Sequence, residues 1–359
     1  MSRGFLRVAL LIAFTAAVCG TASRGFASPD EGKSLVTLPP PSHGMAGPCD
    51  RACLYKFVDK YFDALVSHCA CGLALAPDVK YTENGQEVKP GEGIWKTFTG
   101  RGTYRVYLAD PANGEVAYYG DYNEFKTLQG VIALRLKVKD HQITEVEEIL
   151  DRQQLRPGGG LSLNTAGVMT PMAINELKPS GFVSPDASLL KPVPAADRMT
   201  RDQLIAAADQ YYVGFAQSKG SIVPFADGCS QRVNGIAATN NSDGPAVDPA
   251  QPSFRVYSQS CAGELDRGFF SALMKVGEKR YWVVDDEQGL ALSLALFDSE
   301  GNVKSVPVAG VGNVTAPRAY LRPITFLSPQ LFKIEGGKIV QIEGLSWPVP
   351  YGMRSGWSQ

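Results

Sequence analysis

An internal duplication restricts the fold of this chain more than any other feature. Asp59-Lys-Tyr61 recurs as Asp209-Gln-Tyr211, and Asn84-Gly85 recurs as Asn234-Gly235, at one constant offset of 150 residues. In each copy a helical apolar pattern comes first, followed by a strand pattern that ends at the Asn-Gly turn signal. Two copies are too few for a solenoid. The chain is therefore predicted to hold two related domains, which pack together because a lone copy would expose apolar surface.

A second pair of matching segments closes each copy. Residues 136–147 and 332–343 both alternate between apolar and polar residues on either side of a polar turn, which is the pattern of a β-hairpin. Their offset is 196 residues, so the second copy carries an insertion of 46 residues, expected within 237–260 and 299–318. Each copy is predicted to be a helix, a short strand and then three or four long antiparallel strands. The predicted fold class is α+β.

The first 27 residues have the pattern of a secretory signal peptide. Arg3 and Arg7 precede an apolar run from Val8 to Val18, which is too short to span a bilayer, and small residues lead to Ala27. We therefore expect a secreted or periplasmic protein with no membrane association once the signal is removed. The predicted segments are a signal peptide 1–27, a flexible leader 28–48, a first domain 49–151, a linker 152–199 and a second domain with insertions 200–359.

Charge and composition argue against several partners. The net charge is −1 for the whole chain and −4 without the first 27 residues, and there is no basic stripe. Nucleic acid is therefore not an expected partner. Histidine is scarce, at three residues, and no Gly-rich loop follows a strand, so neither a metal site nor a nucleotide cofactor is expected. The oligomeric state stays open, with a homodimer as one option.

Six cysteines follow the predicted signal, and an even number in an exported protein favours disulfides. Cys229 and Cys261 are alone in the second half, so their pairing is the simplest prediction. The other four allow Cys49–Cys53 with Cys69–Cys71, or crosswise pairs, and the sequence does not decide between them. Four thiolates could also bind zinc, but an oxidising compartment disfavours that alternative.

The order of motifs resembles the nuclear transport factor 2-like cone. The motif Tyr61-x-x-Ala-Leu65 in the first helix, Ala76-Pro-Asp-Val-x-Tyr-Thr-Glu-Asn-Gly85 and the terminal hairpin carry this likeness. Ketosteroid isomerase, scytalone dehydratase and SnoaL-like polyketide cyclases share that fold. More narrowly, segments 49–54, 102–110 and 350–357 resemble a two-copy secreted family of bacteria and fungi. The resemblance implies two tandem cone-shaped domains, each a curved antiparallel sheet wrapped around helices, and a relation to enzymes that cleave lignin-type aryl ethers without glutathione.

The resemblance also implies where chemistry would occur in the first copy. Tyr61 matches the helix tyrosine of the ketosteroid isomerase-like enzymes, and Glu83 matches their catalytic aspartate. Glu83 is therefore predicted as the general base and Tyr61 as a donor to developing negative charge. Val233 replaces Glu83 in the second copy, which points to catalysis in the first copy alone. Alternatively, Tyr61 packs in the core and Glu83 flanks an exposed turn. His68, after the first helix, is the remaining catalytic candidate.

Several residues near these positions are predicted to bind the substrate. Residues 100–107 hold two arginines and two tyrosines, and alternation along a strand would place Arg101 and Arg105 on one face and Tyr104 on the other. An arginine that faces the interior would bind a phenolate or carboxylate, whereas one that faces outward would only be solvated. Trp95 would stack on an aromatic ring or pack in the core. The predicted substrate-binding set is Asn84, Trp95, Arg101, Tyr104, Arg105 and Arg232.

These features predict an extracytoplasmic enzyme that acts on a small aromatic substrate by acid–base catalysis without a cofactor. The most specific implication of the resemblance is cleavage of a phenolic, lignin-type β-aryl ether through a quinone methide. A lyase and a hydrolase both fit that description. Two other classes stay open, because fold alone does not fix function. One is a non-catalytic module that binds an apolar ligand or a partner, and the other is an isomerase or dehydratase.

Overall fold

The computed structural model describes residues 48–125, 128–152, 161–163, 169–171, 184–242 and 258–357. The predicted signal peptide, nearly all of the predicted leader and much of the predicted linker lie outside these ranges. Among the described residues, no helix is both long and apolar enough to cross a membrane.

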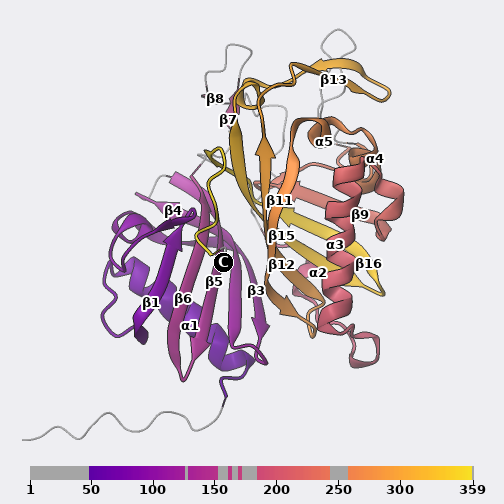
Figure 1. Cartoon of the computed structure of the whole chain (residues 1–359). Helices are drawn as coiled ribbons and strands as arrows, with labels where there is room; N and C mark the ends of the chain where they lie inside the picture. Colours follow the sequence, from indigo (N-terminus) through magenta and orange to yellow (C-terminus); the bar gives the residue numbers. More distant parts are fainter. Residues whose placement is uncertain are drawn as a thin grey trace, which may run out of the picture. The chain divides into compact units, whose positions relative to one another are not determined.

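The first half is a helix packed on one six-stranded sheet (Figure 1). The strands lie in the order β2-β1-β6-β5-β4-β3, and all neighbours are antiparallel except β1 and β6, which are parallel. The Asp50 side chain caps the first helix by accepting a hydrogen bond from the Cys53 backbone N–H. The elements are α1 (Arg51–Val66), β1 (Leu75–Glu83), β2 (Gln86–Glu87), η1 (Gly93–Lys96), β3 (Phe98–Asp110), β4 (Glu115–Glu124), β5 (Leu128–Lys139) and β6 (Gln142–Asp151).

The second half repeats this topology. Its sheet has the order β10-β9-β16-β15-β12-β11, with β17 added beside β15, and β9 is again parallel to β16. The hairpins predicted at 136–147 and 332–343 are confirmed as β5–β6 and β15–β16. The elements that correspond to the first half are α3 (Arg201–Gln217), β9 (Phe225–Val233), β10 (Ile236–Ala237), β11 (Lys275–Asp285), β12 (Leu290–Ser299), β15 (Ile324–Glu335) and β16 (Lys338–Gly344), and the second half adds η3 (Gly220–Ile222) and β17 (Trp347–Pro350).

The remaining elements join the halves or extend the second one. Between the halves lie β7 (Leu161–Leu163), β8 (Met169–Pro171), α2 (Ala187–Leu190) and η2 (Ala195–Asp197). Those of the second half alone are α4 (Cys261–Asp266), α5 (Phe269–Leu273), β13 (Ser305–Val308), β14 (Gly312–Thr315) and η4 (Arg318–Leu321).

The two sheets share a hydrophobic core in addition to the core that each sheet forms with its own helix. Strand residues alternate between the two faces, so one face packs on the helix and the other on the opposite sheet. The shared core contains buried side chains from both halves, among them Leu108, Tyr119, Ile149, Trp282, Leu292 and Leu331. The two copies therefore pack together, as the duplication predicted.

The C-terminal segment returns to the first half. The Nε1–H of Trp357 donates a hydrogen bond to Thr82 Oγ1 of β1 at 2.7 Å. The indole ring lies 4.2 Å from Lys80 Nζ and 4.8 Å from Arg135 Cζ, which are cation–π distances. The motif at 350–357 thus joins the end of the second copy to the sheet of the first.

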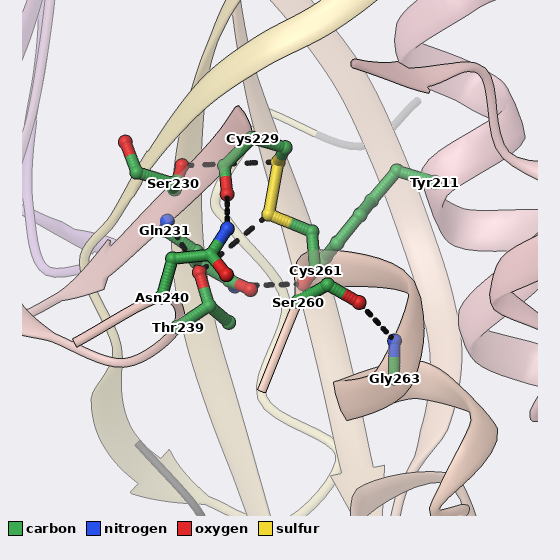
Figure 2. Close-up of a disulfide and its surroundings, with 9 residues drawn as sticks. All are labelled: Tyr211, Cys229, Ser230, Gln231, Thr239, Asn240, Ser260, Cys261 and Gly263. Atoms are coloured by element: carbon green, nitrogen blue, oxygen red, sulfur yellow. Dashed lines mark hydrogen bonds between the residues drawn. A yellow bond between two sulfur atoms is a disulfide. The ribbon is translucent and has the colours of Figure 1, made fainter. Parts of the chain in front are cut away.

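Three disulfides lie within the described residues, and they include the predicted Cys229–Cys261 pair (Figure 2). The first four cysteines pair as Cys49–Cys53 and Cys69–Cys71, so crosswise pairing and a four-thiolate zinc site are both wrong. Cys229–Cys261 joins β9 to α4, and hydrogen bonds secure the loop beside it. The Asn240 side chain donates to the Cys229 carbonyl oxygen, and Thr239 Oγ1 lies 3.6 Å from Cys261 Sγ.

Removal of this disulfide should lower the free energy of unfolding measurably. The cysteines are 32 residues apart, and freeing a loop of that length costs about 3 to 4 kcal/mol in the chain-entropy model. We expect the double substitution Cys229→Ala and Cys261→Ala to lower the urea midpoint accordingly. The control is the pair Cys69→Ser and Cys71→Ser, which opens a loop between cysteines only two residues apart and should cost less. Equal losses in the two double variants would contradict this account.

Candidate active site

A buried carboxyl group lies at the centre of a hydrogen-bonded cluster in the first half. Glu148 of β6 has no solvent-exposed surface. Its Oε2 accepts a hydrogen bond from the Tyr61 hydroxyl of α1 at 2.9 Å, and its Oε1 accepts one from Tyr81 of β1. The Nε1–H of Trp95 in η1 donates to the Tyr81 hydroxyl oxygen at 3.2 Å. Four elements of the first half therefore converge on one acidic group.

Burial changes the acidity of this group. Loss of solvation raises the pKa of Glu148 to about 8, and the negative charge of Glu83 adds to the rise. Hydrogen bonds from Tyr61 and Tyr81 act in the opposite direction, since they stabilise the carboxylate. Burial, together with the charge of Glu148, raises the pKa of both tyrosines well above the usual value. At neutral pH the cluster therefore contains a protonated carboxyl group and two neutral phenols.

Glu83 is the second carboxylate of the cluster, and it is held in a different way. Its Oε2 accepts the Ile94 backbone N–H at 2.7 Å, and its Oε1 forms an ion pair with Arg152 Nη2 at 2.7 Å. The loop can approach this closely because residue 93 is glycine. Gly93 has φ +59, and a Cβ there would lie 2.0 Å from Glu83 Oε2. Glu83 is thus ion-paired with Arg152, and its negative charge raises the pKa of Glu148.

The strand register explains how these side chains meet. Glu83 and Glu148 are Cα partners in the parallel β1–β6 pair. Tyr81 is two residues before Glu83, so both side chains leave β1 on the same face. Tyr61 lies on the buried face of α1, which packs on that side of the sheet. Its ring also meets Trp95 edge to face, with the centroids 5.7 Å apart.

The second half has the tyrosine but not the two acids of the cluster. In the parallel β9–β16 pair, Val233 and Gly344 are the Cα partners that correspond to Glu83 and Glu148. Tyr211 corresponds to Tyr61, and its hydroxyl oxygen accepts a hydrogen bond from Gln231 Nε2 at 3.1 Å (Figure 2). Gln231 corresponds to Tyr81. The acidic cluster therefore belongs to the first copy alone.

Three further predicted residues lie near the cluster in supporting positions. Trp95 is buried and contacts both Tyr81 and Tyr61. The Nδ1–H of His68 donates to the Trp95 carbonyl oxygen, which fixes the end of α1 to η1. The Asn84 side chain bonds the backbone N–H and C=O of Leu150, and Asn234 bonds Ser346 in the same way. Because both copies have this contact, the structure gives Asn84 a role in holding the strand edge.

The strand that carries Arg101 and Arg105 is irregular. The β3–β4 register shifts between these two residues, and the arginines make different contacts. Arg101 stacks over Phe62 at 4.9 Å and pairs with Asp59 Oδ1 at 2.9 Å, whereas Arg105 is exposed and donates to the Gly102 carbonyl oxygen. Between these two residues β3 has two more residues than β4, and simple period-two reasoning cannot locate such an irregularity.

Tyr104 and Arg232 meet in another place, between the two sheets. Tyr104 is fully buried in the shared core. Arg232 forms an ion pair with Glu343 at 3.1 Å, and burial followed by the charge of Glu343 raises the pKa of Tyr104. Neither residue is among the described contacts of Glu148, and their assignment as substrate-binding residues stays a prediction.

Glu148 and Tyr81 are the members of the cluster that the sequence prediction missed. A signal for both was present in the duplication. At the offset of 196, Glu147 matches Glu343 whereas Glu148 matches Gly344, and at the offset of 150, Tyr81 matches Gln231. Comparison of the copies position by position would have shown that Glu148, like Glu83, is an acid found in one copy only.

Comparison with known families gives one match that covers most of the chain. The profile of a family described as "Domain of unknown function (DUF8021)" matches residues 48–150 and 197–346, one stretch in each half. No curated protein matches the chain.

Solved structures give distant likenesses that each cover less than half of the chain. A protein assigned as a polyketide cyclase from Xanthomonas campestris pv. campestris is 12% identical, with a TM-score of 0.25, over 40% of this chain and 90% of its own. A protein assigned as a SnoaL-like polyketide cyclase from Jannaschia sp. CCS1 has the same identity and TM-score over 42% and 90%. A phenazine biosynthesis-related protein from Pseudomonas aeruginosa is 10% identical, with a TM-score of 0.23, over 44% and 95%. Likeness at this level carries no argument about the reaction.

Proposed function

The chain belongs to the family described as domain of unknown function DUF8021, and we propose that it is an enzyme that transfers protons on a small molecule, with Glu148 as the acid–base group. One observation supports this proposal above the others. A fully buried carboxyl group with a pKa of about 8 bonds two tyrosines in the first copy. Such a group can give up and take back a proton near neutral pH.

The cluster offers complementary roles for a proton-transfer reaction. Protonated Glu148 would donate a proton to a leaving oxygen, and its carboxylate would then remove a proton from carbon. The Tyr61 and Tyr81 hydroxyls, which stay neutral, would stabilise negative charge on an oxygen of the substrate. Glu83 places a negative charge beside Glu148, and its ion pair with Arg152 balances that charge. None of these steps requires an electron acceptor or donor.

The finer proposal is cleavage of a phenolic β-aryl ether, which rests on the sequence resemblance. Ionisation of the phenol expels the benzylic hydroxyl as water, with the proton supplied by Glu148, and leaves a quinone methide. Loss of the β-proton to Glu148 gives an enol ether. Addition of water to the enol ether then gives a hemiketal, which collapses to a ketone or an aldehyde and a second phenol. The water lost in the first step is balanced by the water added in the last.

The test is turnover of matched substrates by the purified protein without added cofactor. One substrate is a phenolic β-aryl ether dimer, and the other is the same dimer with its phenol methylated, which cannot form the quinone methide. We expect mass spectrometry to show a released phenol from the first dimer only, and none with the Glu148→Gln variant. Release from both dimers would reject the quinone methide route. Release that is unchanged in Glu148→Gln would reject the site.

The tyrosines of the two copies provide a matched pair of variants. Loss of one donor to a developing oxyanion typically costs about 10²- to 10³-fold in kcat. We expect Tyr61→Phe to lower kcat by about 10²-fold, because its hydroxyl bonds Glu148. Tyr211→Phe removes the corresponding hydroxyl of the second copy, which bonds only Gln231 among the described contacts, and should leave kcat unchanged. Equal effects of the two substitutions on kcat would contradict a site in the first copy.

A further inference from the structure

A group of potential metal ligands lies at the opposite end of α1 from the cluster around Glu148. Cys49 and Cys53 flank the start of the helix, and His141 occupies the turn between β5 and β6. One ligand atom from each of the three lies within 4.8 Å of the other two. Cys53 Sγ and His141 Nδ1 are 3.8 Å apart. In tetrahedral zinc sites the usual Zn–S and Zn–N bonds place S and N about 3.5 Å apart.

This group borders a cavity. The cavity has a volume of about 630 Å³, and its walls include Cys49 and His141 together with Asn113, Lys137 and Lys139. None of the residues that line the cavity belongs to the proposed active site. A metal ion held by the three side chains would therefore have a fourth position that faces open space, as in zinc sites that keep a water molecule.

We propose that reduction of the Cys49–Cys53 disulfide creates a zinc site with Cys49 Sγ, Cys53 Sγ and His141 Nδ1 as ligands. A dithiol supplies the two electrons and two protons that convert the disulfide to two thiols, and is itself oxidised to a disulfide. Zn²⁺ then displaces both thiol protons. The product has two thiolates, one neutral imidazole and one dication, so the first shell has no net charge.

The helix favours the thiolate form that this site requires. Cys53 lies in the first turn of α1, where backbone N–H groups and the helix dipole stabilise negative charge. The sulfurs must separate on reduction, and the proposal assigns that separation to rotation about the Cα–Cβ bonds of the two cysteines. Sulfur and imidazole ligands are the set that zinc prefers. The disulfide and the zinc site are thus two alternative states of one cluster.

The test is cobalt binding to the full chain after reduction with a dithiol and desalting without air. Co²⁺ replaces zinc as a probe and gives a thiolate-to-cobalt charge-transfer band in the near ultraviolet. We expect one equivalent of Co²⁺ to produce the band, Zn²⁺ to remove it, and the oxidised chain to give none. His141→Asn should weaken binding by more than the roughly 10- to 100-fold that loss of an outer-shell partner costs. Asparagine suits this position because residue 141 has φ 57.

Cys69 and Cys71 provide the matched control. They form the other closely spaced pair of the first half, and Cys69→Ser with Cys71→Ser should leave the cobalt band and affinity unchanged. Alkylation of the reduced natural chain supplies a second measurement, in which Zn²⁺ should protect Cys49 and Cys53 but not Cys69, Cys71, Cys229 or Cys261. The proposal is overturned if no band forms, if His141→Asn binds as tightly, or if Zn²⁺ protects a different pair.

Discussion

Glu148→Gln is expected to lower kcat by about 10²- to 10⁴-fold, the usual contribution of a general acid or base. The substitution removes the proton that Glu148 can transfer but keeps a side chain of the same size. Because the pKa of Glu148 is about 8, the natural group is mostly uncharged at pH 7, and the amide replaces it without a change of charge. The folded structure should therefore survive, and circular dichroism with thermal unfolding would verify that. The measurement is steady-state turnover of a substrate that the natural protein converts.

Glu83→Gln distinguishes this assignment from the one that the sequence suggested. The sequence prediction made Glu83 the general base, in which case Glu83→Gln should abolish turnover. The structure has Glu83 bonded to Arg152 and to the Ile94 backbone, with its charge raising the pKa of Glu148. On this basis, Glu83→Gln should shift the pH–rate profile toward lower pH and keep substantial turnover. Full turnover in Glu148→Gln together with none in Glu83→Gln would restore the original assignment.

The fold could be predicted in outline because the duplication presents the same sequence pattern twice. The helix around Tyr61 and the terminal hairpins were found where the sequence placed them, since apolar periodicity and turn signals are local features. The register shift between Arg101 and Arg105 could not be predicted, because both registers satisfy the same alternation. Pairing of the first four cysteines was undecided for a related reason, since pairing depends on distances that spacing does not give.

Resemblance to known motifs located half of the candidate site, and local sequence patterns did not locate the other half. Tyr61 and Glu83 follow from a resemblance at the level of motifs, and both lie in the cluster. Glu148 is 65 residues from Glu83 along the chain, and only the parallel β1–β6 pairing makes them neighbours. Such a pairing is non-local, so propensity and periodicity do not reveal it. The ion pair of Glu83 with Arg152 depends on the same pairing, because Arg152 follows directly after β6.

The buried acid should also make stability depend on pH in a way that needs no substrate. The ordinary pKa of a glutamate is 4.5, whereas that of Glu148 in the folded protein is about 8. Between these pH values the unfolded chain has lost the Glu148 proton and the folded chain has kept it. The unfolded state then binds fewer protons, so the free energy of unfolding falls as pH rises, by about 1.4 kcal/mol per pH unit. The contribution is complete below about pH 4.5 and lost above about pH 8.

Urea unfolding of the natural protein and of Glu148→Gln, from pH 5 to pH 9, isolates this effect. Other buried acids with a raised pKa, such as Glu147 and Glu343, are present in both proteins, so their contributions cancel in the difference. We expect the natural protein to lose stability relative to the variant up to about pH 8 and the difference to stay constant above it. The same comparison in a Glu83→Gln background should level off at lower pH, because Glu83 raises the pKa of Glu148. A difference that does not change with pH would mean that Glu148 has an ordinary pKa, and the chemical argument for the site would then fail even if a substrate were found.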